Sequence, residues 1–218
     1  MKKAIFLLML GTTSLFTQAQ SERFVKAMQN NITAMDTARS AEGYQELANS
    51  FMRIAEAEKT QWLPYYYASL SYVMQGLMLS GGQMGTGGAV TDPLADKAEG
   101  LLNKAMELEK ENSEMYCVKK MISNLRMMAD PMNRYQTEGA AAAEALQKAK
   151  ALDPNNPRTS ILEAQDKFYT PEQFGGSKAE AKTLFEEALK KFETFKPASA
   201  IHPNWGKNQA VYFLSQLK

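Results

Sequence analysis

Cysteine and histidine are nearly absent from this chain of 218 residues, which contains one of each. A single cysteine cannot form a disulfide within the chain, and one copy cannot supply a site with two histidine or two cysteine ligands. Charge of one sign is lacking as well, because the formal net charge is only +1. Such a chain has no large electrostatic field to attract nucleic acid or acidic lipid. We therefore expect no metal site, no cofactor and no nucleic-acid partner.

One long hydrophobic run stands at the N-terminus. Lys2 and Lys3 precede the apolar residues 4–10, and Ala19 is a small residue at a plausible cleavage site. This order is typical of a secretory signal, and the run is too short for a stable membrane span. We predict that residues 1–19 are a cleaved signal peptide and that residues 20–218 form a single helical-repeat domain. We expect the mature protein to lie in the periplasm, without an integral membrane segment.

The lone thiol, Cys117, lies in an apolar patch of a predicted helix at residues 115–118 (MYCV). A single cysteine in an oxidising compartment is safest when it is buried. We predict that Cys117 is a small core residue and not a reactive group.

Alternating strand patterns are missing too. Hydrophobic residues recur with the helical period over nearly every segment, which predicts an all-α fold. Asp92, Asp130 and Asn156 each precede a proline, so each is expected to cap a helix whose first residue is that proline. Ser177 and Glu180 have the spacing of a capping box, which predicts a helix start at Ser177. The predicted helices are 21–37, 40–59, 62–79, 93–110, 113–129, 132–152, 157–169, 177–195 and 204–217.

Three of these helices carry versions of one segment. Residues 102–108 (LNKAMEL) recur as 146–152 (LQKAKAL), and residues 185–189 (FEEAL) are a looser copy. Recurring helices at spacings of 44 and 39 residues indicate a stacked helical array. Ala105, Ala149 and Ala188 occupy matching positions, where neighbouring helices must approach closely. The array predicts antiparallel pairs made of helices 62–79 with 93–110, 113–129 with 132–152, and 157–169 with 177–195.

The copies at 102–108 and 146–152, with the exit turn at 152–157 (LDPNNP), resemble the second helix of a tetratricopeptide repeat. Residues 62–68 (WLPYYYA) are similar to its first helix, although the units here exceed the standard 34 residues. The segments 168–176 (FYTPEQFGG) and 202–206 (HPNWG) are similar to secreted tetratricopeptide-like proteins of Gram-negative bacteria. Over about residues 40–217 the resemblance implies a right-handed solenoid of helix pairs that acts as a binding scaffold. A distant similarity to the periplasmic repeat component of some solute transporters implies a small apolar ligand.

Candidate binding residues come from the aromatic helix 62–79, from the middle helices and from the second glycine-containing loop. The aromatic residues could pack between helices or form a recognition wall. The glycines could present N–H groups to an anion or form a tight turn. The glycine-rich loop at 81–88 is expected to be mobile. The candidate residues are Trp62, Tyr65, Tyr72, Tyr116, Arg126, Phe174, Gly175 and Gly176.

Three functional hypotheses follow. The first is a periplasmic tetratricopeptide-like scaffold that binds a protein or peptide without catalysing a reaction. The second is a component that binds a small apolar solute for a transporter, in a pocket lined by Met and Tyr. The third is an enzyme on a helical scaffold, which would need a carboxylate pair facing a cleft, since the sequence holds no nucleophile motif around His202.

Overall fold

A computed structural model describes residues 13–217 of the chain, with side chains from residue 22 onward. The described residues form helices and turns and no strand, so the all-α prediction is confirmed. The helices are α1 (Thr13–Thr37), α2 (Ala41–Ala57), α3 (Trp62–Ser80), α4 (Gly88–Leu108), α5 (Ser113–Ala129), α6 (Pro131–Arg134), α7 (Ala140–Leu152), α8 (Pro157–Tyr169), α9 (Lys178–Thr194) and α10 (Lys207–Gln216). A π-helical turn, η1 (Tyr135–Gly139), joins α6 to α7, and a short 3-10 turn, η2 (Glu172–Phe174), follows α8.

Helix caps agree with the sequence at most of the predicted positions. Asn156 accepts a hydrogen bond from the backbone N–H of Arg158 at 3.0 Å, and Ser177 accepts one from Glu180 at 3.1 Å. Asp130 caps α6 through the N–H of Asn133 at 3.4 Å. Each cap satisfies a backbone donor that the first turn of a helix leaves unpaired.

The predicted start of α4 is wrong. The helix begins at Gly88, and Pro93 lies inside it. Asp92 does not cap the helix, because its two carboxylate oxygens accept hydrogen bonds from Arg134 at 2.7 and 2.8 Å. Arg134, which is distant in sequence, therefore binds the carboxylate of Asp92 that the local pattern predicted to cap the backbone.

The predicted helix 132–152 is interrupted. The π-helical turn η1 (Tyr135–Gly139) separates α6 from α7, and such a turn shifts the facing of the residues that follow it. Ala145 and Ala149 consequently face the core, whereas Met132 and Tyr135 remain exposed.

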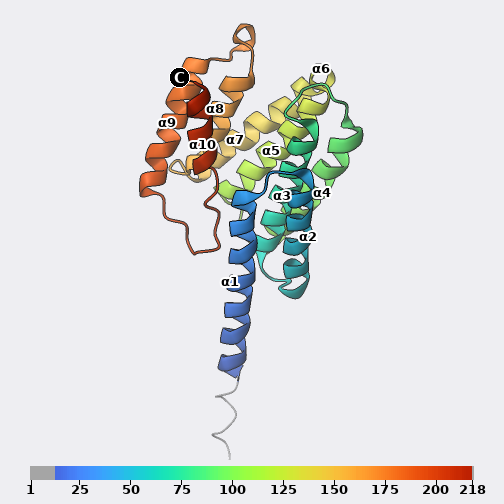
Figure 1. Cartoon of the computed structure of the whole chain (residues 1–218), viewed down its shortest axis with the longest axis vertical. Coiled ribbons are helices and arrows are strands. Elements are labelled where there is room, and N and C mark those ends of the chain that lie inside the picture. Colours follow the sequence, from blue (N-terminus) through green and yellow to red (C-terminus); the bar gives the residue numbers. More distant parts are fainter. Residues whose placement is uncertain (1–12, 218) are drawn as a thin grey trace, which may run out of the picture.

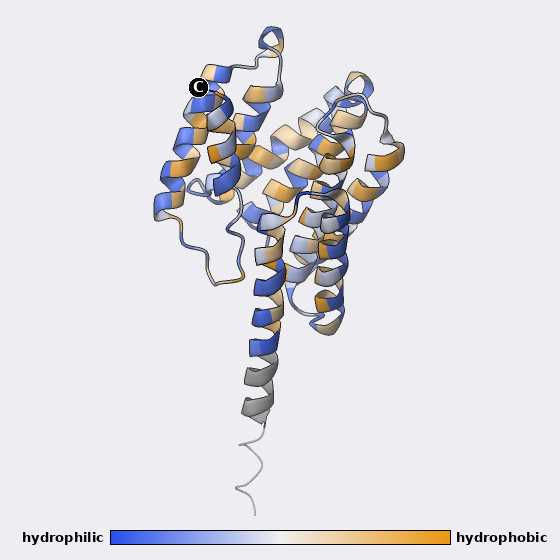
Figure 2. Cartoon of the chain, in the orientation of Figure 1, coloured by the Kyte–Doolittle hydropathy of each residue, from blue (hydrophilic) through white to orange (hydrophobic). Residues whose placement is uncertain are grey.

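The predicted pairs are present: α3 packs on α4, α5 on α7, and α8 on α9. The matched alanines of the repeat, Ala105, Ala149 and Ala188, are all fully buried. Cys117 is also fully buried, as predicted. Figure 2 shows hydrophobic and hydrophilic residues alternating along α9, as expected for an amphipathic helix at the surface.

Two hydrophobic clusters divide the molecule. The larger is built mainly from α1 to α7, around Tyr66, Phe51 and Leu102. The smaller is built from α8, α9 and α10, around Phe185 and Phe213. We call α1–α7 the N-terminal lobe and α8–α10 the C-terminal lobe. Figure 1 shows the two lobes side by side, with α5 and α7 of the N-terminal lobe next to α8 and the first part of α1 extending away from the body.

The glycine-rich loop at 81–88 is attached to its surroundings. The N–H groups of Gly85 and Gly87 donate to the carbonyl oxygens of Met128 and Ala129 at 2.8 and 2.9 Å. These are last-turn carbonyls of α5, which have no partner within their own helix. The loop therefore caps α5, and the expectation of a freely mobile loop is wrong at these two positions.

Most of the predicted signal peptide, residues 1–12, lies outside the described residues. Residues 13–19 continue α1 as helix. Within residues 13–217, no helix combines the length and apolar character needed to cross a bilayer.

Candidate ligand-binding site

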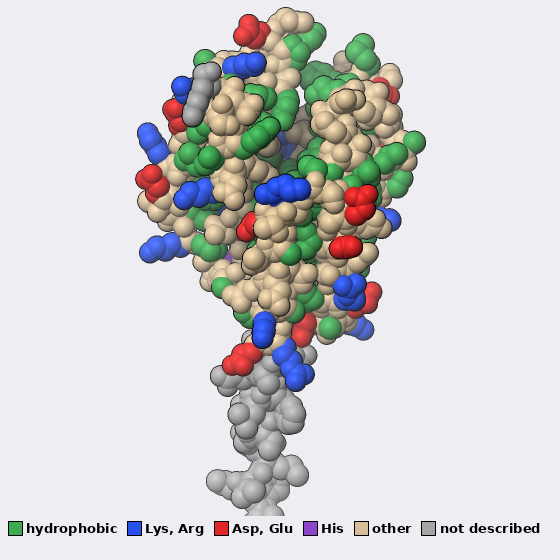
Figure 3. All heavy atoms as spheres, in the orientation of Figure 1, with side chains coloured by type: hydrophobic (Ala, Val, Ile, Leu, Met, Phe, Trp, Pro, Cys, Tyr) green, Lys and Arg blue, Asp and Glu red, His purple; other side chains and the backbone are tan. Residues whose placement is uncertain are grey.

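A hollow separates the two lobes. Figure 3 shows it opening between the C-terminal lobe and the upper part of the N-terminal lobe, with hydrophobic side chains along both walls. Figure 1 places α8 and α10 on one side of this opening and α6 on the other. These elements and the adjoining turn η1 carry large apolar side chains that remain exposed, namely Tyr169, Val211, Tyr212, Met132 and Tyr135. Exposed apolar groups gathered in this way mark an interaction site.

The wall formed by α8 and α10 carries an aromatic cluster. Phe168 and Tyr169 end α8, and their ring centroids lie 5.1 Å apart in an edge-to-face arrangement. Phe213 contacts both rings, at 5.2 and 5.8 Å, and stacks on Phe185 of α9 at 4.9 Å. Tyr212 lies beside Phe213 at 5.5 Å.

Burial divides this cluster into an anchor and a surface. Phe213 and Phe185 are buried, so they hold the group to the core of the C-terminal lobe. Tyr169 and Tyr212 are 56% and 60% exposed. The two tyrosines therefore present a rigid aromatic surface on a fixed support, which is the arrangement that favours stacking with a planar apolar ligand.

The phenol of Tyr169 is held in its protonated form. Partial burial, with a smaller contribution from the neighbouring Tyr212, raises the pKa of Tyr169 above its usual value. The neutral phenol can stack on a planar ligand and donate a hydrogen bond.

A positive charge lies at the edge of the aromatic cluster. The Nζ of Lys178 is 5.8 Å from the centre of the Phe168 ring. Lys167, one turn before the end of α8, pairs with Glu180 at 2.6 Å. Among the residues that the structure describes, no carboxylate forms an ion pair with Lys178, so its Nζ can meet an anionic group of a ligand.

Midway along α8, a polar pair joins the lobes. Lys120 of α5 donates to Asp166 at 2.7 Å, and Asn124 lies 3.5 Å from the same oxygen. The Lys120 side chain is almost fully buried, whereas Asp166 is nearly half exposed. The partly exposed carboxylate of Asp166 on α8 therefore compensates the charge of the buried Lys120 on α5.

A buried network fixes the lobes at the start of α8. The guanidinium of Arg158 donates to Glu114 from Nε at 2.9 Å and from one terminal nitrogen at 2.5 Å. Asn156 donates to the same Glu114 oxygen at 2.8 Å, and the indole N–H of Trp205 donates to the Tyr66 hydroxyl at 2.8 Å. Burial raises the pKa of Glu114, although the Arg158 charge opposes the shift. Arg158, at the start of α8, is separated from Tyr169, at its end, by about 16 Å along the helix axis.

The residues singled out from the sequence do not form one site. Within the described chain, no hydrogen bond, ion pair or ring contact joins any two of them. Trp62 is buried in the core, where its ring lies 5.6 Å from that of Tyr66. Tyr65 and Tyr72 are half-buried and pack on the same core.

The remaining predicted residues have local partners. Tyr116 donates to Glu111 at 2.8 Å and is flanked by two lysines. Arg126 pairs with Asp96 and Glu99 at 2.6 and 2.9 Å. Gly175 has a positive φ of 91°, and Gly176 packs against the carbonyl of Thr170, so this turn is structural. Phe174 is 73% exposed on η2, just beyond α8.

The sequence analysis missed Tyr169, Tyr212 and Phe213. Their one signal was two adjacent aromatic pairs, at 168–169 and 212–213, near the ends of separate helices. Nothing in the sequence shows that α8 and α10 bring these pairs together.

In residues 13–217 there is no group of three or more His, Cys, Asp or Glu side chains placed to hold a metal ion. His202 lies elsewhere, with its ring 5.8 Å from that of Trp62 and its Nδ1 2.7 Å from the Ser199 hydroxyl.

The chain was compared with known protein families, curated proteins and solved structures. No protein-family model matches the chain, and no curated protein matches it in sequence. A solved structure does match: the HusA haemophore from Porphyromonas gingivalis is 31% identical, with a TM-score of 0.76, and the alignment covers 89% of this chain and 92% of that one. The chain belongs to the family of this haemophore. The chain is therefore similar to a haemophore of a Gram-negative bacterium, and a haemophore is a binding protein.

Proposed function

We propose that this protein binds haem, or a closely related tetrapyrrole, in the hollow between its lobes and carries it outside the cytoplasm. The observation that carries the proposal is the anchored aromatic surface of Tyr169 and Tyr212, in a member of a haemophore family. This is the small-apolar-ligand alternative from the sequence, with an open hollow in place of a closed pocket.

The chemistry of a tetrapyrrole fits both walls. Its planar face can stack on Tyr169 and Tyr212, which lose little conformational entropy because Phe213 and Phe185 support them. On the opposite side, the flexible, polarisable side chain of Met132 is 92% exposed and can adapt to the second face. The carboxylates of the ligand can pair with Lys178 at the edge of the cluster.

The iron is not expected to determine the affinity. His202, the single imidazole of the chain, packs on Trp62, away from the cluster. We therefore expect binding to depend on the ring system, so that protoporphyrin without iron binds within about threefold of haem.

The direct test is titration of the mature protein with haemin, followed by its visible absorption and by quenching of tryptophan fluorescence. Tyr169→Ala and Tyr212→Ala should each weaken binding about tenfold, which is ~1.4 kcal/mol for the loss of one stacked ring. Tyr116→Ala removes an equally aromatic but distant side chain and is the matched control. His202→Asn should also bind normally. Unchanged affinity in the Tyr169→Ala/Tyr212→Ala double variant would exclude the hollow as the site.

The absence of catalytic activity is part of the same proposal. Glu114 is the deeply buried carboxylate at the lobe junction, and Arg158 compensates its charge. A carboxylate that is buried and paired with Arg158 is unsuited to general acid–base catalysis, because a substrate cannot reach it to exchange a proton. The protein should not change the tetrapyrrole chemically, and chromatography of ligand recovered after incubation would check this.

We also propose that residues 1–19 are removed on export to the periplasm and that the stacked helix pairs form a right-handed tetratricopeptide-like solenoid. The paired packing of α3 with α4, α5 with α7 and α8 with α9 supports the second point. Native mass spectrometry of protein purified from its own cell envelope tests the first. It should give a polypeptide that begins at residue 20 and an adduct with the mass of haem, whereas retention of the leader would contradict export with cleavage.

A further inference from the structure

The side of the hollow opposite Tyr169 and Tyr212 is formed by α6 and the π-helical turn η1. Met132 and Tyr135 lie three residues apart, so they share one helical face, and they are 92% and 68% exposed. A π-helical turn is rare and is frequently found at a functional site. Here it separates α6 from α7, and Tyr135 is its first residue. Tyr135 therefore follows α6 directly at the edge of the opening that Figure 1 shows.

Arg134 ties this second wall to two other helices. Its guanidinium donates to both carboxylate oxygens of Asp92 on α4, at 2.7 and 2.8 Å, and to the carbonyl oxygen of Arg126 on α5 at 3.2 Å. A planar guanidinium that is bound at three points allows its own backbone little movement. The turn that begins at the next residue, Tyr135, is therefore held in place relative to α4 and α5.

Gly139 leaves room for the Tyr135 ring. The backbone of Gly139 is ordinary right-handed helix, with φ −63° and ψ −41°, so this conformation does not require a glycine, which is unfavourable inside a helix. A Cβ at this position would lie 3.4 Å from the Tyr135 ring and 3.2 Å from the sulfur of Met127. The ring therefore lies against the face of Gly139 that carries no side chain. What this position supplies is space.

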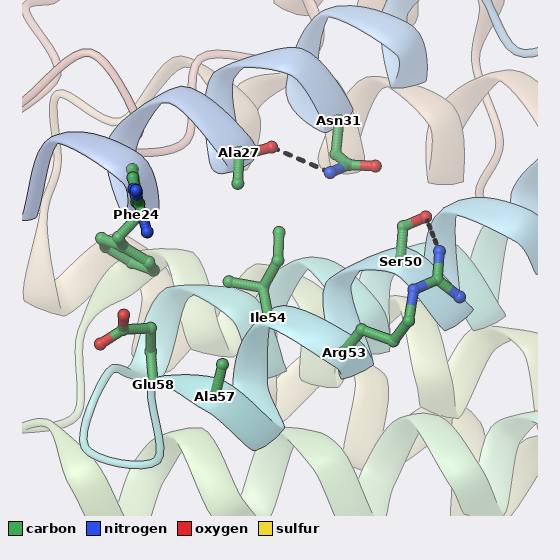
Figure 4. Close-up of a pocket in the computed structure, with 9 residues that line it drawn as sticks. Phe24, Ala27, Asn31, Ser50, Arg53, Ile54, Ala57 and Glu58 are labelled. Carbon is green, nitrogen blue, oxygen red and sulfur yellow. Dashed lines mark hydrogen bonds between the residues drawn. The ribbon is translucent and has the colours of Figure 1, made fainter. Parts of the chain in front are cut away.

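The groove between α1 and α2 offers no comparable aromatic surface. Figure 4 shows Phe24 on α1, with Ile54 and Arg53 on α2, around this open groove. Among its lining residues that the structure describes, Phe24 is the aromatic one. A flat ring system would meet a single stacking partner there, whereas the hollow carries exposed tyrosines on both sides. The second wall of the hollow is thus the better candidate for a further ligand contact.

We propose that Tyr135 contacts the tetrapyrrole from the second wall and that Gly139 positions the Tyr135 ring for this contact. The contact depends on the proposed function, because it lies in the same hollow. An aromatic ring supplies a large apolar surface with few rotatable bonds, and Met132 beside it is flexible enough to follow the ligand surface. The ligand is then held by aromatic side chains of both lobes, so both walls contribute to its affinity.

Titration of variants with haemin tests the role of the ring. Tyr135→Ala should weaken binding about tenfold, whereas Tyr135→Phe, which keeps the ring and removes only the hydroxyl, should bind within about twofold of the wild type. Tyr116→Ala is the control, because it removes a tyrosine of α5 whose hydroxyl is bound to Glu111, and it should leave the affinity unchanged. Equal weakening by Tyr135→Phe and Tyr135→Ala would overturn the assignment of the contact to the ring.

The positioning role of Gly139 is tested by Gly139→Leu. Leucine favours a helix, but its side chain occupies the space against which the Tyr135 ring lies, so haemin should bind about tenfold more weakly. In the Tyr135→Ala background the same change should have no further effect, because the two residues act through one contact. Gly100→Leu is the matched control, since a Cβ at Gly100 meets open space. Thermal unfolding would verify that each variant is folded. A loss of affinity that persists without Tyr135 would contradict the positioning role.

Proton NMR with iron-free protoporphyrin gives a readout that does not depend on affinity. The ring current of the macrocycle shifts the signals of nearby protons, so the ring signals of Tyr135 should move when the protein is saturated, and they should move less in saturated Gly139→Leu. Unchanged Tyr135 signals in the saturated wild type would overturn the proposal. Haemin binding that is sensitive to Tyr169→Ala/Tyr212→Ala and insensitive to Tyr135→Ala would overturn this contact alone. Binding that is insensitive to all three changes would overturn the proposed function as well.

Discussion

At the scale of single residues, this protein uses its rare and its buried side chains as packing elements. His202 lies against Trp62, and partial burial lowers the pKa of its imidazole below the ordinary value of about 6.5. In the unfolded chain the same imidazole binds a proton near pH 6.5. As the pH falls through that value, the unfolded state gains a proton that the folded state resists, so folding stability decreases.

Because the chain has a single histidine, this prediction can be checked directly. Proton NMR should show one imidazole whose pKa lies below 6.5. His202→Asn should reduce the loss of stability between pH 7 and pH 5 in urea denaturation. An imidazole that titrates above 6.5 would contradict the burial argument.

The buried pair at the base of α8 gives a second residue-scale prediction. Arg158→Leu leaves Glu114 buried without its partner and should destabilise the protein by about 3–5 kcal/mol in urea unfolding. The double variant Glu114→Leu/Arg158→Leu removes both charges and should cost clearly less than the sum of the single changes. Simple additivity of the two changes would mean that the pair does not act as a unit.

At the scale of elements, two glycines with different surroundings predict opposite effects. A Cβ at Gly176 would overlap the carbonyl of Thr170, where the chain turns from η2 into α9. A Cβ at Gly100, inside α4, would meet open space. Gly176→Ala should therefore destabilise the protein, whereas Gly100→Ala should stabilise it by about 0.5–1 kcal/mol, because alanine favours helix. Thermal unfolding of both variants measures this difference, and a stabilising Gly176→Ala would show that the turn can relax.

The elements also show where local sequence rules hold and where they fail. The caps at Asn156 and Ser177 follow from the sequence because each involves residues two or three positions apart. The predicted cap at Asp92 failed because Arg134, 42 residues away, binds that carboxylate. The prediction of one continuous helix over 132–152 failed for a different reason, since the residues of η1 (Tyr135–Gly139) carry no composition signal for a π-helical turn.

At the scale of the whole molecule, Cys117 reports on cooperative unfolding. Its thiol is fully buried, and burial raises its pKa well above the usual value. A thiol reagent should therefore label Cys117 only when the larger core opens, at a rate that follows global stability. Saturating haem should slow the labelling, because a ligand that binds only the folded state adds to its stability. Rapid labelling of the native protein would show that the core opens locally around α5.

The sequence by itself determined most of the helices, because helical period and capping depend on residues only a few positions apart. The repeated segment determined the pairing of the helices and the buried alanines at its matched positions. It also determined that Cys117 is a core residue, since an apolar neighbourhood on one helix face predicts burial. Tertiary structure alone decided the candidate site. Tyr169 and Tyr212 are 43 residues apart. Both lie beside Phe213, because α10 packs on α9 and brings the Phe213 ring to the end of α8. Packing also placed Arg53 beside an apolar groove and Arg158 beside Glu114. No pattern along the chain distinguishes these two arginines.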